Sequence, residues 1–295
     1  MSQFTTGLVN GVSIGAVFAL IALGYTMIYG IVKMINFAHG EFIVVGGFTM
    51  YGMNKLLVSK VPLWANATIS IITAIVACVV VVLITERLAY RPLRKRDNNR
   101  INPLITAIGV SYILYGIFNL IQSSQLKPPA FFPFLETRVD KMIFLLAVTT
   151  LCLVLLTLFY QKTKLGIATR AVSENADAAK LMGINNDFTI ALTFALAAIM
   201  AAISALLFYT YNDTGMKFSD GTLLIGLIPF AAAVVGGIGS LPGAVVGGFI
   251  IGMVQEMAAA FGLSKWQVLF IYGILVLVLL LKPSGIFGRN EGEKV

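Results

Sequence analysis

Long segments without a single charged side chain constrain this sequence more than any other feature. A bilayer core about 30 Å thick is crossed by roughly 20 helical residues. Charge-free stretches of at least that length cover residues 1–32, 61–85, 101–126, 142–161, 188–212 and 221–255. Residues 42–54 and 266–281 are shorter, but their flanking residues can extend them. The fold class is therefore predicted to be all-α, a polytopic bundle of transmembrane helices.

The number of crossings depends on the region around residue 240. Residues 221–264 carry one charge, Glu256, and are too long for one crossing. Four glycines and a proline within residues 236–243 disfavour an uninterrupted helix there. We expect nine crossings, with eight crossings and a re-entrant segment as the alternative. In both cases residues 1–295 form a single transmembrane domain.

Composition excludes a soluble fold. Charged residues make up 12% of the chain and hydrophobic residues 58%, whereas soluble domains usually carry about 25% charged residues. A net charge of +8 would suggest nucleic acid in a soluble chain. Here the basic residues lie between apolar runs, so we interpret the surplus as the positive-inside bias of a membrane protein. The chain is expected to contact membrane lipid and no nucleic acid.

The 21 basic residues divide fourteen to seven between the two sides of the predicted bundle. The richer side holds Lys33 and residues 87–100, 161–187 and 282–295. The other side holds Lys55, Lys60, Lys127, Arg138, Lys141, Lys217 and Lys265. Because cytoplasmic loops carry the excess of lysine and arginine, the richer side is predicted to be cytoplasmic. The N-terminus is then outside and the C-terminus inside the cell.

Groups that could carry catalysis are sparse. His39 is the only histidine, and Cys78 and Cys152 lie inside apolar runs. We therefore predict no metal site and no cofactor. The dipeptide Gly-Lys does not occur, so the chain has no Walker A loop with which to bind ATP. The chain is predicted not to be an enzyme.

Two interruptions of the apolar runs are candidates for a pore lining or a gate. The first lies between the first two spans and holds Asn36, His39, Gly40 and Glu41; the second holds Gly237, Gly239, Ser240, Pro242 and Gly243. Non-helical backbone at membrane depth is tolerated where it lines a cavity. The alternative for the first is a cytoplasmic turn whose Glu41 stabilises a helix start. The alternative for the second is close helix packing through small residues.

Residues 161–187 form the longest polar segment, and the charge distribution places them in the cytoplasm. Residues 167–182 are rich in alanine and predict one helix, which Gly183 would end. One face of this helix is small and mildly apolar, and by its spacing it holds Val172, Ala176, Ala179 and Gly183. Such a face suits docking into a groove of another protein. A plain surface helix is the alternative.

Several motifs resemble a known family. Ala178-Ala179 followed by Gly183 resembles the coupling segment of ABC-importer permeases, although Glu174 is displaced from the usual position of a glutamate there. More specific blocks look like branched-chain amino acid permeases, and most like their LivH-type subunit. They are Asn10-Gly11 and residues 19–25, Met-Ile-Asn-Phe-Ala-His-Gly-Glu at 34–41, and residues 86–94, 236–244 and 283–288.

The resemblance implies an ABC-importer permease of the bacterial inner membrane that carries Leu, Ile and Val. Its partners would be a second homologous permease, two cytoplasmic ATPase subunits, and a periplasmic or lipid-anchored substrate-binding protein. The coupling residues would be Arg170, Glu174, Ala178, Ala179 and Gly183 in the loop 161–187. Transport would follow alternating access driven by the ATPases. The alternatives are a stand-alone secondary transporter or channel, and an ABC permease for amides or urea.

Overall fold

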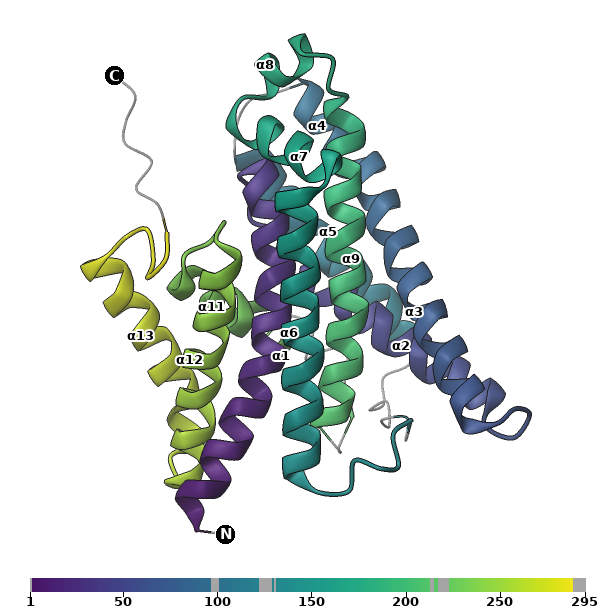
Figure 1. Cartoon of the computed structure of the whole chain (residues 1–295), viewed down its shortest axis with the longest axis vertical. Coiled ribbons are helices and arrows are strands. Elements are labelled where there is room, and N and C mark those ends of the chain that lie inside the picture. The colour runs from purple at the N-terminus through teal and green to yellow at the C-terminus, as the bar shows by residue number, and fades with distance from the viewer. Residues whose placement is uncertain are drawn as a thin grey trace.

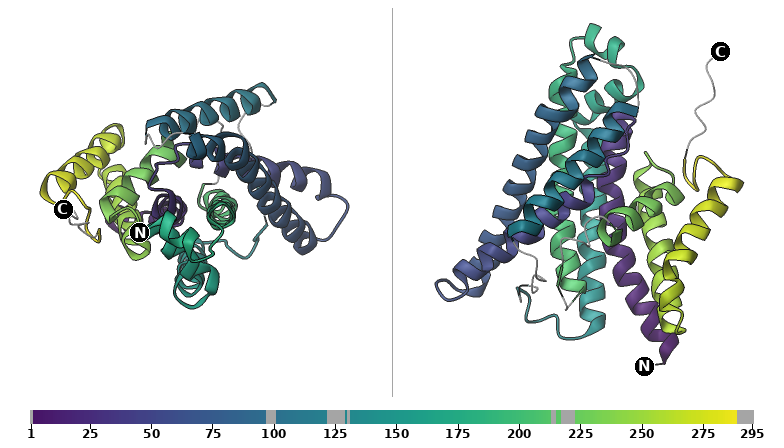
Figure 2. Two further views of the ribbon diagram at one scale, coloured as in Figure 1. Left: turned by 90° about the horizontal axis from the view of Figure 1, so that it is seen from above. Right: turned by 180° about the vertical axis from the view of Figure 1, so that it is seen from behind.

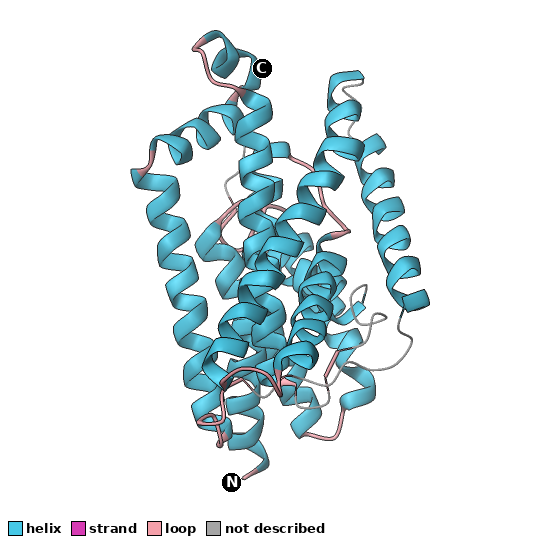
Figure 3. Ribbon diagram, turned by 90° about the vertical axis from the view of Figure 1, so that its right-hand side faces the viewer, coloured by secondary structure: helices cyan, strands magenta, loops and turns pink. Residues whose placement is uncertain are grey.

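The described part of the chain is built from helices joined by turns (Figure 3). The computed structural model describes residues 2–96, 101–121, 129, 131–212, 215–216 and 223–288. Five residues of the charge count lie outside this range: Arg100, Lys127, Lys217, Arg289 and Lys294.

The elements follow one another along the chain without a described β-strand between them (Figure 1). They are α1 (Gln3–Val32), α2 (His39–Leu57), α3 (Leu63–Thr85), η1 (Glu86–Tyr90), α4 (Arg91–Arg96), α5 (Ile101–Ile121), α6 (Arg138–Lys162), α7 (Lys164–Glu174), α8 (Ala176–Leu181), α9 (Asn186–Tyr211), η2 (Leu223–Leu227), α11 (Ile228–Gly236), α12 (Leu241–Ala260), η3 (Ser264–Trp266) and α13 (Gln267–Leu281). The elements η1 and η2 are π-helical turns, and η3 is a 3-10 turn.

Seven helices of the described ranges are long and apolar enough to cross a membrane, fewer than the eight or nine expected. The two expected crossings that fall short are α2 and the η2–α11 unit. Helix α2 begins at His39-Gly40-Glu41 and ends near Lys55, and these polar ends shorten its apolar length. The apolar helix at residues 225–236 has 12 residues, or about 18 Å at 1.5 Å per residue. This described part reaches across about half of a bilayer core.

Helix α1 lies at the centre of the bundle (Figure 2). It packs against α6, α9, α11 and α12, and its side chains from Ser13 to Ile28 are buried. Because every face meets another helix, the sequence of α1 is apolar all round rather than along one stripe.

A seam of glycines brings α1 and α12 together in antiparallel orientation. Gly7, Gly11 and Gly15 follow one another at intervals of four and so lie on one face of α1. A Cβ added to Gly252 would lie 2.5 Å from the Cα of Gly15, and one added to Gly11 would lie 3.1 Å from the Cα of Met253. Small residues at this spacing let helix backbones approach closely in a membrane. The seam therefore fixes α12 along the length of α1.

The two ends of the bundle carry different sets of basic residues. Helices α7 and α8 lie at one end, here called the α8 end, together with the last turn of α1 (Figure 1). Phe287 and Gly288, after α13, line one cavity with residues of α7 and of the last turns of α1. The start of α1 lies at the opposite end, beside Ala260. Helix α4 and the last turn of α1, which carry or adjoin described residues of the predicted cytoplasmic set, lie toward the α8 end (Figure 1). The end of α2 and the start of α6, which carry Lys55 and Arg138, lie toward the opposite end.

Candidate functional site

The connection between α1 and α2 passes through the interior of the bundle. Helix α1 ends at Val32, and the next residue, Lys33, has a left-handed backbone with φ 54°. Helix α2 then begins at His39, whose ring lies so close to Gly24 that an added Cβ there would clash with it. Gly24 is nine residues before Lys33, or about 13 Å along the helix. Residues 34–38 therefore bring non-helical backbone inside the bundle.

The polar side chains of this connection are buried and only partly satisfied. The Oδ1 of Asn36 accepts hydrogen bonds from the Tyr90 hydroxyl at 2.8 Å and from the Ala38 backbone N–H at 3.1 Å. Neither the Nδ2 of Asn36 nor either ring nitrogen of His39 has a hydrogen-bond partner among the described residues. Glu41 is 2% exposed and accepts a hydrogen bond from Ser111 at 3.3 Å. The first set of pore candidates, which includes the buried Gly40, is thus closed to solvent in this conformation.

Tyr25 marks the place where the two short helical units meet. The centroid of its ring lies 4.7 Å from the ring centroid of His39, at the start of α2, and 5.8 Å from that of Phe230 in α11. Its hydroxyl donates a hydrogen bond to the carbonyl of Gly226 in η2 at 3.2 Å. Many transporters build their substrate sites from discontinuous helices that meet near the bilayer midplane. Sequence reasoning missed Tyr25, because its partners lie 14 to about 200 residues away and leave no local pattern.

The second set of candidates forms the tight turn between α11 and α12. Gly237 and Gly239 have φ values of 105° and 96°, which favour glycine. Ser240 caps α12 and accepts a hydrogen bond from the Gly243 backbone N–H at 3.3 Å. A Cβ on Gly243 would lie 2.5 Å from the carbonyl oxygen of Gly236. Gly243 thus serves close packing, the alternative that the sequence left open, while Gly237 serves the turn.

A cavity of about 690 Å³ at the α8 end brings two groups of candidate residues together. Gly239, Ser240 and Pro242 line it from the glycine turn, and Arg170 and Glu174 line it from α7. The sequence had assigned these residues separately to gating and to coupling.

The other candidates lie elsewhere. Residues 36–41 lie deeper in the bundle, and Ala178, Ala179 and Gly183 belong to α8 and the turn after it.

The coupling segment is two helices rather than the single helix expected at 167–182. Asn175 is extended, with φ −155°, and separates α7 from α8. Its side chain accepts a hydrogen bond from the Ala178 backbone N–H at 2.9 Å and so caps α8. Gly183, with φ 84°, ends the segment as expected. The helix preference of the alanines was weighed too heavily against this capping asparagine.

The face expected to dock onto a partner is partly covered by the chain itself. Val172 and Ala179 are 3% and 4% exposed, and α7 packs against α1, α6 and α9. Two apolar side chains of α8 and its turn are left open instead, Leu181 at 89% and Met182 at 83% exposure.

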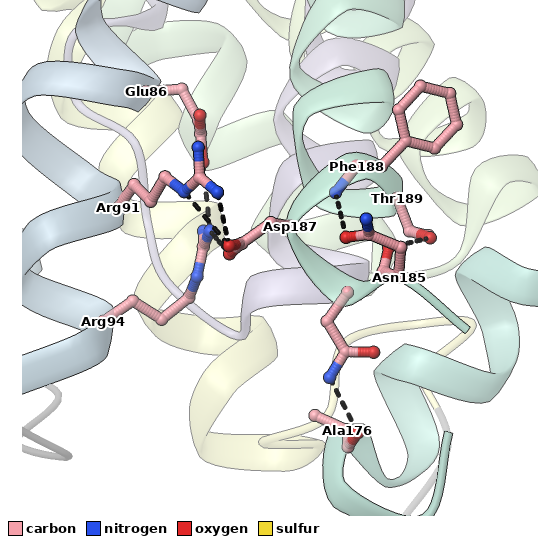
Figure 4. Close-up of polar contacts among 9 residues, drawn as sticks. Glu86, Arg91, Arg94, Ala176, Asn185, Asp187, Phe188 and Thr189 are labelled. Carbon is pink, nitrogen blue, oxygen red and sulfur yellow. Dashed lines mark hydrogen bonds and ion pairs between the residues drawn. The ribbon is translucent and has the colours of Figure 1, made fainter. Parts of the chain in front are cut away.

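A charge network connects the start of α9, just after the coupling segment, to η1 and α4 (Figure 4). Asp187, in the first turn of α9, accepts hydrogen bonds from Arg91 at 2.6 and 3.1 Å and from Arg94 at 3.1 Å. Arg94 also pairs with Glu86 at 3.0 Å. Next to Asp187, the side chain of Asn186 donates to the carbonyl of Ala176 in α8 at 2.7 Å. The network therefore connects the end of the coupling loop to η1 and α4, which follow α3.

Sequence reasoning used Arg91 and Arg94 only to orient the bundle. The i, i+8 spacing of Glu86 and Arg94 and the acid at the start of α9 were the available signals. Arg94 and Asp187, which are in contact, lie more than 90 residues apart in the sequence.

Known proteins match this chain along nearly its whole length. The family model described as branched-chain amino acid transport system / permease component matches residues 7–279. The chain is 40% identical to the high-affinity branched-chain amino acid transport system permease protein BraD of Pseudomonas aeruginosa, over 98% of this chain and 97% of that protein. The corresponding permease protein LivH of Escherichia coli is 36% identical, over 99% of this chain and 98% of its own.

A more distant relative is also similar over most of its length. The probable branched-chain amino acid transport permease protein LivH of Methanocaldococcus jannaschii is 31% identical, over 91% of this chain and 88% of its own. The motif blocks at residues 34–41, 86–94 and 236–244 thus led to the right family. The chain belongs to the family of permease components of branched-chain amino acid transport systems.

Proposed function

We propose that this chain is the permease subunit of an ATP-binding-cassette importer that carries leucine, isoleucine and valine across the bacterial inner membrane. The observation that carries the proposal is identity of 36–40% over nearly the full length to high-affinity branched-chain amino acid permeases. ATP hydrolysis is assigned to separate ATPase subunits, and the permease alternates its access between the two sides of the membrane.

The distribution of charge supports an externally driven permease. Among the described residues, the buried carboxylates are Glu41 and Glu86, and Glu86 is paired with Arg94. Glu256, which the sequence places inside a span, is only half-buried and lies four residues before the end of α12. Proton-coupled transporters use chains of ionisable groups within the membrane. A path almost free of fixed charge suits a zwitterionic cargo with an apolar side chain.

The α8 end is assigned to the cytoplasm, which places the N-terminus outside and the C-terminus inside. Of the two ATPase subunits of the importer, one would dock there on the loop 161–187, with Arg170, Glu174, Ala178, Ala179 and Gly183 at or near the contact. Since Ala179 is buried, the exposed pair Leu181 and Met182 provides the apolar part of this contact. A second homologous permease completes the pore, and a periplasmic or lipid-anchored protein delivers the amino acid at the opposite end.

The two interruptions are assigned to gating. Rigid helices move as units about a few loop residues. The segments 34–38 and 237–239 are non-helical and separate α1 from α2 and α11 from α12. A movement of α7 would be passed on to α9, against which it packs, and from Asp187 in α9 to Arg91 and Arg94 in α4.

Reconstitution tests this function. The chain, its paired permease and the ATPases are placed in proteoliposomes with internal ATP, and uptake of radiolabelled leucine, isoleucine and valine is measured with the binding protein outside. We expect uptake that requires both ATP and the binding protein. Uptake by the chain alone would identify a secondary transporter or channel, and uptake of urea or acetamide but not leucine would identify an amide importer.

A further inference from the structure

The sequence Pro-Ser-Gly-Ile-Phe-Gly at residues 283–288 lies outside both interruptions that are assigned to gating. It directly follows α13, which packs against α11 and α12. The segment returns to the turn that joins these two helices, and its backbone pairs there with the end of α11 (Figure 1). It therefore touches the gate from a part of the chain that the gating segments themselves do not include.

The segment completes the carbonyl end of α11. A helix leaves its last four carbonyl groups without a partner inside the helix. In α11 the first two of these accept hydrogen bonds from the backbone N–H of Gly237. The last two, on Val235 and Gly236, accept from the backbone N–H groups of Ile286 at 3.0 Å and Phe287 at 2.9 Å. Half of this helix end is thus held by residues that follow α13.

Water has little access to the two carbonyl groups that the segment holds. Val235 is 0% exposed, and Gly236 is also buried. A buried backbone carbonyl without a partner is costly. A movement of α11 that left the segment behind would break both hydrogen bonds with no replacement, so the partner has to travel with the helix.

Close backbone packing also holds the segment against the glycine turn. Gly285 has a φ of 76°, and a Cβ added to it would lie 2.6 Å from the Cα of Gly237. A Cβ added to Gly237 would in turn lie 2.9 Å from the Cα of Gly288. The two backbones approach this closely because glycine stands at the points of contact.

We propose that residues 283–288 form a clasp that positions the glycine turn and makes α11 and α13 move as one body in the transport cycle. Its role in transport rests on the proposed function. Helix α11 is short, and it is joined to α12 by a turn that is assigned to gating. Without the clasp its carbonyl end is free to move separately from α13, and a cycle of ATP hydrolysis no longer gives a defined movement of the gate. Gly285, Ile286 and Phe287 are therefore positioning residues, because they act through the turn.

Gly285→Ala breaks the clasp, and Gly262→Ala is its matched control. Gly262 lies in the turn after α12 and has a φ of 77°, and a Cβ added to it meets no heavy atom within 4 Å. Both variants place an alanine in left-handed backbone and have the same local cost. A difference between them therefore reports the contact of Gly285 with Gly237.

Hydrogen exchange tests whether the clasp stays closed. Exchange of the peptide that contains Ile286 and Phe287 is measured by mass spectrometry on the assembled importer in nanodiscs, without nucleotide and after trapping with ATP and vanadate. We expect slow exchange in both states of the unaltered importer, and exchange at least about tenfold faster in Gly285→Ala. Fast exchange in either state of the unaltered importer overturns the proposal. This arm needs no variant, so it decides the question even when Gly285→Ala does not assemble.

The number of ATP molecules hydrolysed per leucine imported tests the role in coupling. It is measured in proteoliposomes with the binding protein present. We expect Gly285→Ala to raise this ratio by about threefold or more, and Gly262→Ala to leave it unchanged. A clasp that served stability alone would lower hydrolysis and uptake together, so an equal ratio in the two variants contradicts this inference and leaves the proposed function intact. An unaltered importer that carries no branched-chain amino acid contradicts the proposed function itself.

Discussion

Asp187→Ala is expected to lower the free energy of unfolding by about 2–3 kcal/mol. Asp187 accepts three charge-assisted hydrogen bonds from two arginines, at 2.6–3.1 Å. Hydrogen bonds to charged groups contribute about 1.5–3 kcal/mol each when buried. Here the side chains of Arg91 and Asp187 are 33% and 29% exposed, so solvent screening reduces each contribution. In the Asp187→Ala variant Arg91 loses both of its hydrogen bonds to Asp187, whereas Arg94 loses one and keeps its bond to Glu86. The total loss of stability should therefore be close to that of one strong ion pair plus one weaker hydrogen bond.

The assay is a double-mutant cycle on the purified chain in detergent, with the unfolding midpoint followed by circular dichroism. Asp187→Ala, Arg91→Ala and the double variant are compared with the unaltered chain. Residues in one ion-pair network show coupling energies of about 0.5–3 kcal/mol, and we expect about 1–2 kcal/mol for this pair. Asp177→Ala is the matched control, because Asp177 is an exposed acid in the first turn of α8. Its removal should change stability by less than about 0.5 kcal/mol.

Strict additivity of the two single variants would refute the reasoning. So would an Asp187→Ala variant as stable as the Asp177→Ala control. Either result would mean that the network seen in Figure 4 contributes no net free energy, and that the end of the coupling loop is positioned by helix packing alone.

Three further changes test the fold and the sites. Gly252→Leu should destabilise the chain by about 1–3 kcal/mol or more, because the Cβ of the new leucine would meet the backbone of Gly15. The control Gly116→Leu should not destabilise it, because Gly116 has open space around it. Equal unfolding midpoints for the two variants would contradict the glycine seam. Leu181→Ser with Met182→Ser should weaken co-purification with the ATPase, whereas the exposed pair at the opposite end, Leu56→Ser with Val58→Ser, should leave it intact; equal assembly of both variants would remove the docking assignment. His39→Leu should lower uptake while the unfolding midpoint stays level or rises, since the change removes two buried nitrogens that have no hydrogen-bond partner among the described residues. A lower unfolding midpoint with normal uptake would mean that His39 serves packing alone.

The long spans could be predicted from the sequence because length and apolarity are local properties. Residues 188–212 and 142–161, for example, became α9 and α6 with few changes at their ends. Helix α2 and residues 225–236 were counted as crossings for the same reason, since an apolar run does not reveal the depth at which its helix begins. That depth is set by contacts such as His39 on Gly24, which no local pattern records.

The candidate residues could be located from the sequence but not sorted by role. The glycine turn was found through its composition, yet only the structure separates Gly243, packed against Gly236, from Ser240 on the cavity wall. The break at Asn175 could have been found, because an asparagine followed by Ala176-Asp177 is a helix-start signal. The pairing of Asp187 with Arg91 could not, since the two are 96 residues apart.

The unpaired nitrogens of His39 and the two short helical units belong to one argument about movement. A buried polar group without a partner costs about 1–3 kcal/mol, and a helix that begins inside the bundle leaves backbone N–H groups to be satisfied there. A bundle selected for stability alone would remove both features by replacing His39 with an apolar residue and lengthening α2. Their presence beside Tyr25, where α2 and η2 meet, is explained if a second arrangement of the helices satisfies them. The long spans joined by the glycine seam then act as the frame, and the two short units act as the parts that change position within it.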